Sequence, residues 1–196
     1  MLGKFGLHAL ASAVVVRTQL LIALLLGLAT RFRIGGVFLV ECFDAQGKLR
    51  WSQYAVNGVT DAGIAHILNV YFRGTSPVTT WYLGLINNSG YTALAASDTS
   101  GSHSGWAEAA GSNYSNSNRV TWSPGSPSSG AIVNSTSSDF NMTATVTIKG
   151  LFLISDNTKG GTTGTLFSTA LFTGGNQAVN DGDTLKVTYT MSAASS

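Results

Sequence analysis

The 196-residue sequence has few charged residues, a single cysteine, and no acidic residue before Glu41. Charged residues make up 10% of the chain while glycine, serine, threonine and asparagine are abundant, which favours short strands and turns over a helical bundle. The single Cys42 excludes an internal disulfide and a zinc site built from cysteines. Because its neighbours Val40 and Phe43 are typical of a strand, we expect a buried, unreactive thiol.

Basic residues are also unevenly placed. The segment before the first acidic residue carries about +4, and the remainder of the chain carries about −2. Because the body has no cluster of arginine or lysine, we expect no nucleic-acid binding by the folded part. The sequence also lacks a phosphate-binding loop, an EF-hand, an HExxH motif and a GxSxG motif, which removes the commonest signatures of metal and nucleophile chemistry.

Residues 1–34 form an apolar, basic N-terminal arm or helix. The uninterrupted apolar run, residues 20–29, would span about 15 Å as a helix, which is about half of a bilayer core. A longer span would place Arg17 near the middle of the membrane, which is unfavourable. Three interpretations stay open: an arm packed against other protein subunits, a membrane anchor, and an uncleaved signal peptide. We favour packing against another subunit, because so large an exposed apolar surface would aggregate.

Two β-rich runs begin the body, at residues 37–43 and 48–56. They flank the sequence DAQG, in which Asp44 and Gly47 are residues that tight turns prefer, so we predict a hairpin. Trp51 and Tyr54 should then point to opposite faces of the second strand, one into the core and the other outward.

One helix is predicted in the body, from Thr60 or Asp61 at its N-terminus to Gly74 at its end. Four apolar residues follow helical spacing across this segment: Ile64, Ile67, Leu68 and Tyr71. His66 lies beside that stripe, and we interpret it as a structural residue, since no second histidine sits at helical spacing.

The remaining sequence alternates strands with turns. Residues 142–148 and 185–191 alternate apolar residues with threonine or lysine, which is typical of half-buried antiparallel strands. With one strand near residues 79–86 and others near 120–122, 131–133 and 166–172, we count eight or nine strands. The predicted fold is mainly β: residues 35–196 form an antiparallel sandwich, jelly-roll or immunoglobulin-like, with one short helix and the apolar arm.

The loop at residues 97–108 concentrates the side chains that could carry chemistry. Asp98, His103 and Glu108 are the candidate metal ligands, since imidazole with two carboxylates suits zinc or manganese. A serine hydrolase is the other chemical alternative, but no strained nucleophile turn is present. We favour a structural interpretation, in which Asp98 caps the loop backbone, His103 bonds across the loop and Trp106 plugs one end of the sandwich. We therefore predict no catalytic residue, cofactor or metal.

Several separated blocks of the body resemble one family. They read GVTDAGIAHILNVYFRGTSPVTTWYLGLI at residues 58–86, SDTSGSHSGWAE at 97–108, NRVTW at 118–122, GGTTGTLFSTALFTGG at 160–175 and VNDGDTLKVTYT at 179–190. These blocks are similar to small structural proteins encoded by tailed bacteriophages, and the resemblance covers residues 35–191. The arm departs from that pattern.

The resemblance implies a non-enzymatic virion protein located in the capsid. A head decoration or cement protein is the expected role, with a tail or head–tail component as the alternative. Its partners would be the major capsid protein and copies of itself. The residues expected at interfaces are Phe5, Leu21, Leu25, Arg31, Arg33, His103 and Trp106.

A different class of protein also fits the composition. A membrane-anchored β-sandwich used for adhesion or carbohydrate binding would contact the membrane only through the arm. Its sugar-stacking surface would be formed by Trp81, Tyr82, Trp106 and Trp122, although aromatic residues in strands more often belong to the core.

Overall fold

The computed structural model describes Thr18, Leu21 and residues 32–195. The chain divides into two compact units, residues 1–33 with 193–196, and residues 34–192. In the first unit, Thr18 and Leu21 are helical, and the other described residues are the ends of two strands. The second unit holds the rest of the described chain, including the helix and nearly all of the sheet.

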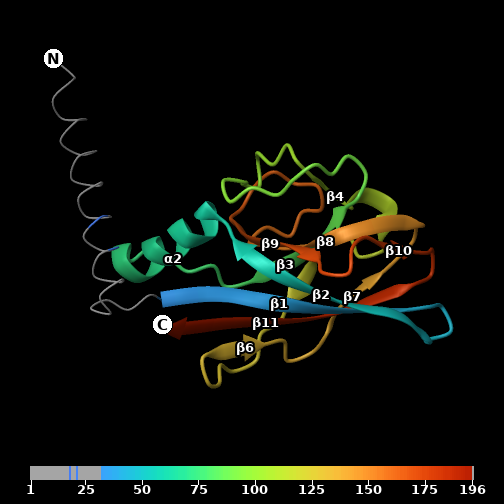
Figure 1. Cartoon of the computed structure of the whole chain (residues 1–196), viewed down its shortest axis with the longest axis horizontal. Helices are drawn as coiled ribbons and strands as arrows, with labels where there is room; N and C mark the ends of the chain where they lie inside the picture. Colours follow the sequence, from blue (N-terminus) through green and yellow to red (C-terminus); the bar gives the residue numbers. More distant parts are fainter. Residues whose placement is uncertain (1–17, 19–20, 22–31, 196) are drawn as a thin grey trace, which may run out of the picture. The chain divides into compact units, whose positions relative to one another are not determined.

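Eleven strands form one sheet in the described part of the chain (Figure 1). In chain order the elements are β1 (Phe32–Phe43), β2 (Leu49–Val59), α2 (Asp61–Arg73), β3 (Trp81–Asn87), β4 (Ala107–Glu108), η1 (Gly111–Asn113), β5 (Val120–Trp122), β6 (Ala131–Val133), β7 (Ser138–Asn141), β8 (Val146–Ile154), β9 (Leu166–Phe172), β10 (Gln177–Val179) and β11 (Thr184–Ser195).

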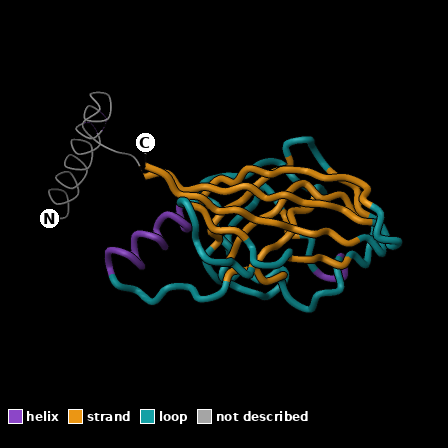
Figure 2. Tube along the Cα trace, turned by 90° about the horizontal axis from the view of Figure 1, so that it is seen from below, coloured by secondary structure: helices purple, strands orange, loops and turns teal. Residues whose placement is uncertain are grey.

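The strand order along the sheet is β4-β3-β8-β9-β2-β1-β11-β6, with β5 beside β3, β7 beside β11 and β10 beside β8. The sheet curls into a half-barrel, and its strands run side by side with α2 at one end of them (Figure 2). A mainly β, antiparallel fold with one short helix in the body is therefore confirmed. A sandwich of the jelly-roll or immunoglobulin type is a finer statement that this topology does not establish.

The predicted hairpin is β1 paired with β2. The Asp44 side chain accepts hydrogen bonds from the backbone N–H groups of Gln46 and Lys48, and Gly47 has a φ of 79°, which a side chain would strain. Trp51 packs edge-on against the Phe172 ring, whereas Tyr54 is 55% exposed. The two aromatic residues thus point to opposite faces, as the period of two predicts.

Local sequence signals also fix the ends of α2. The Thr60 hydroxyl accepts a hydrogen bond from the Gly63 N–H at 3.0 Å, and Gly74 ends the helix in the left-handed conformation. Gly63 is buried against β9: a Cβ atom there would lie 2.4 Å from the Phe167 carbonyl oxygen. The first turn of the helix therefore lies directly against β9.

The two sides of α2 differ in burial. Ile67 packs against the core, and His66 makes an edge-to-face contact with Trp81 at 5.5 Å. The opposite side is exposed although it is apolar. Its members are Ile64, Leu68, Tyr71 and Phe72.

The middle of the sheet is formed by β3, β8 and β9, and β8 and β9 are buried along nearly their whole length. Glycines permit this packing: the Phe152 ring covers Gly84, and a Cβ atom at Gly150 would lie 1.9 Å from the Ala170 carbonyl oxygen. The predicted alternating strand at residues 142–148 is wrong in its bounds, because β7 ends at Asn141 and β8 starts at Val146. The alternation predicted for residues 185–191 is present in β11.

Cys42 is buried in β1, as expected. Its thiol lies 3.6 Å from the Asp183 carboxylate, which also pairs with Arg50 and accepts from the Asn180 N–H. Burial, followed by the neighbouring Asp183 charge, raises the pKa of the Cys42 thiol to about 12. The thiol is therefore protonated, and unreactive, at neutral pH.

Candidate functional site

The polar loop between β3 and β4 is folded around the Trp106 side chain. The Trp106 indole N–H donates to Asp98 Oδ2 at 2.9 Å, and the same oxygen accepts from the Ala95 N–H at 2.9 Å. His103 stacks on the indole at 4.1 Å between ring centroids, and its Nδ1 lies 3.1 Å from the Trp106 carbonyl oxygen. Phe152 of β8 contacts the indole at 5.2 Å. These contacts form a brace that holds the loop on the sheet.

Backbone hydrogen bonds close the same loop on itself. The N–H groups of Thr92 and Ala93 both donate to the Gly105 carbonyl oxygen. Position 105 requires glycine, because a Cβ atom would lie 2.2 Å from the Ala93 carbonyl oxygen. The Ser100 hydroxyl donates to the Thr163 carbonyl oxygen at 2.6 Å and so ties this loop to the loop after β8. Gly105 thus permits close packing within the loop, and Ser100 joins this loop to the one after β8.

Glu108 belongs to a different set of contacts, formed by Arg119, Glu108 and residues 156–161, which we call the Arg119 group. The Arg119 guanidinium donates to both Glu108 carboxylate oxygens, with the shortest contact at 2.8 Å, and both side chains are almost completely buried. Its other N–H groups donate to the carbonyl oxygens of Asp156 and Gly161, and Glu108 also accepts from the Gly160 N–H. Every polar atom of this pair has a partner in the protein, which is what makes a buried ion pair tolerable.

The Arg119 group reaches outward through two more side chains. Hydrogen bonding by the Thr158 backbone N–H is the main effect that lowers the pKa of the Asp156 carboxyl. Lys159 donates to the carbonyl oxygens of Gly111 and Tyr114, and burial lowers the pKa of its ammonium group. Three loops are thereby joined through charged hydrogen bonds.

The three candidate metal ligands do not come together. Asp98 and His103 face Trp106, whereas Glu108 is engaged by Arg119 and Gly160. Within the described part of the chain, no group of three or more histidine, cysteine, aspartate or glutamate side chains could hold a metal ion. Only a small void of about 10 Å³ separates His103 from the Arg119 group, so a substrate has no room there. The hydrogen bonds of these three side chains hold the loop and β4 in place.

Arg119 was not predicted from the sequence, although it is the centre of the larger charge group. It follows Glu108 by 11 positions and meets residues 156–161 only through the fold. No local pattern marks such an arginine. The one available signal is that this stretch of uncharged, turn-rich sequence contains a single basic residue next to a predicted strand.

Of the four residues predicted for a sugar-stacking surface, Trp106 and Trp122 are buried, and Trp81 and Tyr82 are half-buried. Trp106 and Trp122 are about 5% exposed or less, and the indole N–H of Trp122 is bonded to Asn134. Trp81 is half-buried and packs edge-on against Phe167. Trp106 and Trp122 belong to the interior, so these two cannot present a flat face to a carbohydrate.

The predicted interface residues fall into three sets. Phe5, Leu25 and Arg31 lie outside the described residues. Leu21 and Arg33 are described and exposed. His103 and Trp106 are engaged with each other in the brace, so Trp106 is too deeply buried to contact a neighbouring protein directly.

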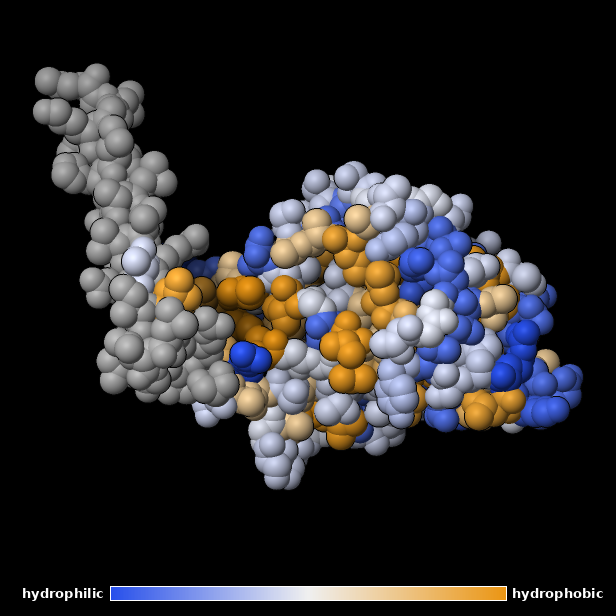
Figure 3. Space-filling view, viewed as in Figure 1, coloured by the Kyte–Doolittle hydropathy of each residue, from blue (hydrophilic) through white to orange (hydrophobic). Residues whose placement is uncertain are grey.

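Apolar side chains are instead exposed on α2 and on the outer face of the sheet (Figure 3). On the sheet, Val37 of β1 is paired with Val56 of β2, and Val56 with Leu171 of β9. Val56 is 62% exposed and Tyr54, on the same face, is 55% exposed. Hydrophobic residues therefore form part of the exposed outer face of the sheet.

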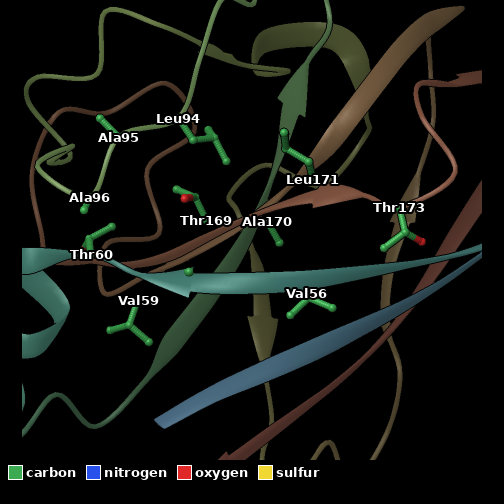
Figure 4. A pocket seen from close by; sticks show the side chains of 11 residues that line it. Val56, Val59, Thr60, Leu94, Ala95, Ala96, Thr169, Ala170, Leu171 and Thr173 are labelled. Atoms are coloured by element: carbon green, nitrogen blue, oxygen red, sulfur yellow. The ribbon is translucent and has the colours of Figure 1, made fainter. Parts of the chain in front are cut away.

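A groove of about 380 Å³ lies beside this patch, between the loop at residues 94–96 and strands β2 and β9 (Figure 4). Its lining residues are uncharged, and they include Val56, Leu94 and Leu171 together with Thr60, where α2 begins. Such a lining suits an apolar side chain and offers no group for acid–base chemistry.

Comparison with known proteins adds no assignment. No protein-family model matches this sequence, and a search of curated proteins gives no match either. Among the described residues, no helix is both long enough and apolar enough to cross a membrane. The function must therefore be inferred from the geometry of the chain itself and from the resemblance of its sequence blocks.

Proposed function

We propose that this chain is a non-enzymatic structural protein of a tailed-phage virion, most specifically a decoration or cement protein of the capsid. The observation that carries this proposal is that the polar side chains with chemical potential are bonded within the body, whereas large apolar side chains are exposed on its surface. The side chains of Asp98, His103 and Glu108 are occupied by hydrogen bonds within the protein, while apolar side chains are exposed on α2 and the outer sheet face. Such a molecule is equipped to bind other proteins.

The interior supports a role that requires rigidity. Asp98, Trp106 and the Arg119 group fix long loops to the sheet through buried hydrogen bonds. A rigid body loses little conformational entropy when it binds, which favours association. In a shell, many copies would each add a modest contact, and these contacts become effectively intramolecular once the shell has formed. A jelly-roll or immunoglobulin-like sandwich, the finer fold expected from the sequence, would serve the same purpose.

The test is reconstitution on shells assembled from the major capsid protein encoded with this chain. We expect the purified protein to co-sediment with such shells until a fixed number of sites is filled, and to raise the temperature at which the shells break. Binding to isolated tails and not to shells would assign the alternative, a tail or head–tail component. Flotation with lipid vesicles, without binding to shells or tails, would overturn the virion proposal and favour a membrane-anchored adhesion module.

A further inference from the structure

Helix α2 carries an apolar surface that its own fold does not use. Ile64, Leu68, Tyr71 and Phe72 are 46%, 51%, 78% and 81% exposed. Their spacing places them in one stripe along the helix, which borders Ile67 and faces away from the buried Gly63. An amphipathic helix normally turns such a stripe to the core, so this helix has a second apolar side in addition to the one that it packs on the sheet.

The stripe has the properties of a contact for another helix or an extended apolar chain. It contains two aromatic residues, the type most enriched at the centres of protein interfaces, and no charged residue lies within it. From Ile64 to Phe72 it is about 12 Å long at the rise of an α-helix. The partner must therefore supply an uncharged apolar stretch of similar length.

The chain itself contains such a stretch outside the described body. Residues 20–29, LLIALLLGLA, have no charged or strongly polar side chain, and as a helix they would span about 15 Å. Arg17 and Arg31 flank this run, and α2 carries the exposed Asp61 one turn before the stripe and the exposed Arg73 directly after it, so one arginine of the run can pair with Asp61. Length and apolar character thus match between the run and the stripe, and the flanking charges are complementary at the Asp61 end.

We infer that the stripe on α2 is a docking surface for residues 20–29 of a second copy of this chain. Within residues 34–192 no other segment covers these four side chains, so the body leaves the stripe open to a partner. A contact between one copy's apolar run and the next copy's helix is heterologous, and such contacts generate closed rings or filaments. The contact does not depend on a capsid and holds for the isolated protein.

Two full-length variants test this contact. The segment variant, Leu25→Glu with Leu26→Glu, places charges in the apolar run. The helix variant, Leu68→Glu with Phe72→Glu, places the same charges in the stripe. We expect the unchanged protein to form an oligomer by light scattering and each variant alone to have the mass of one chain, 20.4 kDa. At least a tenfold loss of self-affinity is expected for each.

Mixing the two variants is the decisive measurement, because each keeps the partner surface that the other has lost. We expect an equimolar mixture to form a one-to-one complex. A matched control, Ser117→Glu with Ser126→Glu, adds two charges at exposed positions away from α2 and should leave the oligomer unchanged. If the helix variant loses its circular-dichroism signal, the milder pair Leu68→Gln with Phe72→Gln replaces it.

Other occupants give different outcomes, and each would overturn the inference. A segment variant that stays oligomeric while the helix variant does not would indicate pairing of α2 with α2. An unchanged protein that is monomeric in buffer and binds only to lipid vesicles would indicate a membrane as the partner. Variants that are both monomeric, with no complex on mixing, would also reject the contact.

Discussion

The loop at residues 88–106 and the helix α2 both depart from what their compositions suggest about binding. A polar loop suggests a site and an apolar helix suggests a core element, and neither expectation holds. The loop is rich in polar side chains, yet its aspartate, histidine and tryptophan bond to one another and to the backbone. The helix is rich in apolar side chains, yet four of its large ones are exposed. Composition indicates which residues can interact, but only unsatisfied or uncovered groups indicate where a partner binds.

The difference also separates two kinds of mutational effect. Substitutions in the loop and its neighbouring charge group should lower the free energy of unfolding, since they leave buried groups unpaired. Substitutions on the outer side of α2 should leave that free energy almost unchanged and act on association. Four predictions test this separation, beginning with the largest effect.

The largest effect is expected for Arg119→Met. The substitution leaves the buried Glu108 carboxylate without its guanidinium partner, and breaking a buried pair in this way costs about 3–5 kcal/mol. Urea unfolding followed by tryptophan fluorescence measures the loss. Arg73→Met, at an exposed arginine on α2, is the control and should change the free energy of unfolding by less than about 0.5 kcal/mol. Equal effects at the two positions would contradict the structural role of the Arg119 group.

A smaller loss is expected when the brace loses its carboxylate. Asp98→Ala leaves the N–H groups of Trp106 and Ala95 without an acceptor, which costs about 1–3 kcal/mol. Thermal unfolding should show a fall in melting temperature of about 2–4 °C for each kcal/mol lost. Asp98→Asn keeps an acceptor oxygen and should lose less. If the asparagine and alanine variants are equally destabilised, hydrogen bonding is not the contribution of this side chain.

The buried thiol predicts a pH dependence of stability. Because the pKa of Cys42 is raised from its ordinary value of 9.0 to about 12, the unfolded chain loses this proton at lower pH than the folded chain. Stability is therefore fully present below pH 9 and falls as the pH rises from 9 toward 12, by at most about 1.4 kcal/mol per pH unit. Urea unfolding at pH 8, 9 and 10 measures the slope.

Cys42→Ala supplies the control for this pH effect. The variant should show a smaller loss of stability between pH 9 and 10 than the unchanged protein, and the same slope as that protein between pH 6 and 8. Burial also raises the pKa values of Tyr114 and Tyr189, so part of the alkaline loss above pH 10 persists in the variant. Identical slopes between pH 9 and 10 would exclude Cys42 as the cause.

The smallest effect is expected on the outer side of α2. Phe72→Gln should change the free energy of unfolding by less than about 0.5 kcal/mol, because the ring is 81% exposed. Ile67→Ala, on the side that packs against the core, should cost about 1–2 kcal/mol, less than for a fully buried isoleucine. Urea unfolding compares the two variants. A loss at Phe72 as large as that at Ile67 would show that the stripe contributes to the fold of the monomer.

Local signals allowed much of the fold to be predicted. The hairpin and the helix were correct because their turn and cap residues act within a few positions: Asp44 on Gln46 and Lys48, and Thr60 on Gly63. The brace at Asp98 was predictable for the same reason, since its partners lie within eight residues. Short-range hydrogen bonds leave a signature in the sequence.

Long-range contacts were not predictable in this way. The spacing of Ile64, Leu68 and Tyr71 indicated a helix but could not tell which side faces the sheet, because that choice depends on the close approach of Gly63 to Phe167. The Arg119 group unites residues up to 52 positions apart in the chain. The placement of Glu108 away from Asp98 and His103 likewise follows from β4 pairing with β3. These features arise from packing between distant segments, which periodicity does not encode.

The buried position of Cys42 has a practical consequence for studying assembly. Since the chain has no other cysteine and this thiol is protonated at neutral pH, maleimide reagents should leave the native protein unlabelled. A cysteine introduced at an exposed position would then be the single reactive group. Fluorophores or spin labels could be attached there without first removing a native residue, which makes distances between neighbouring copies directly measurable.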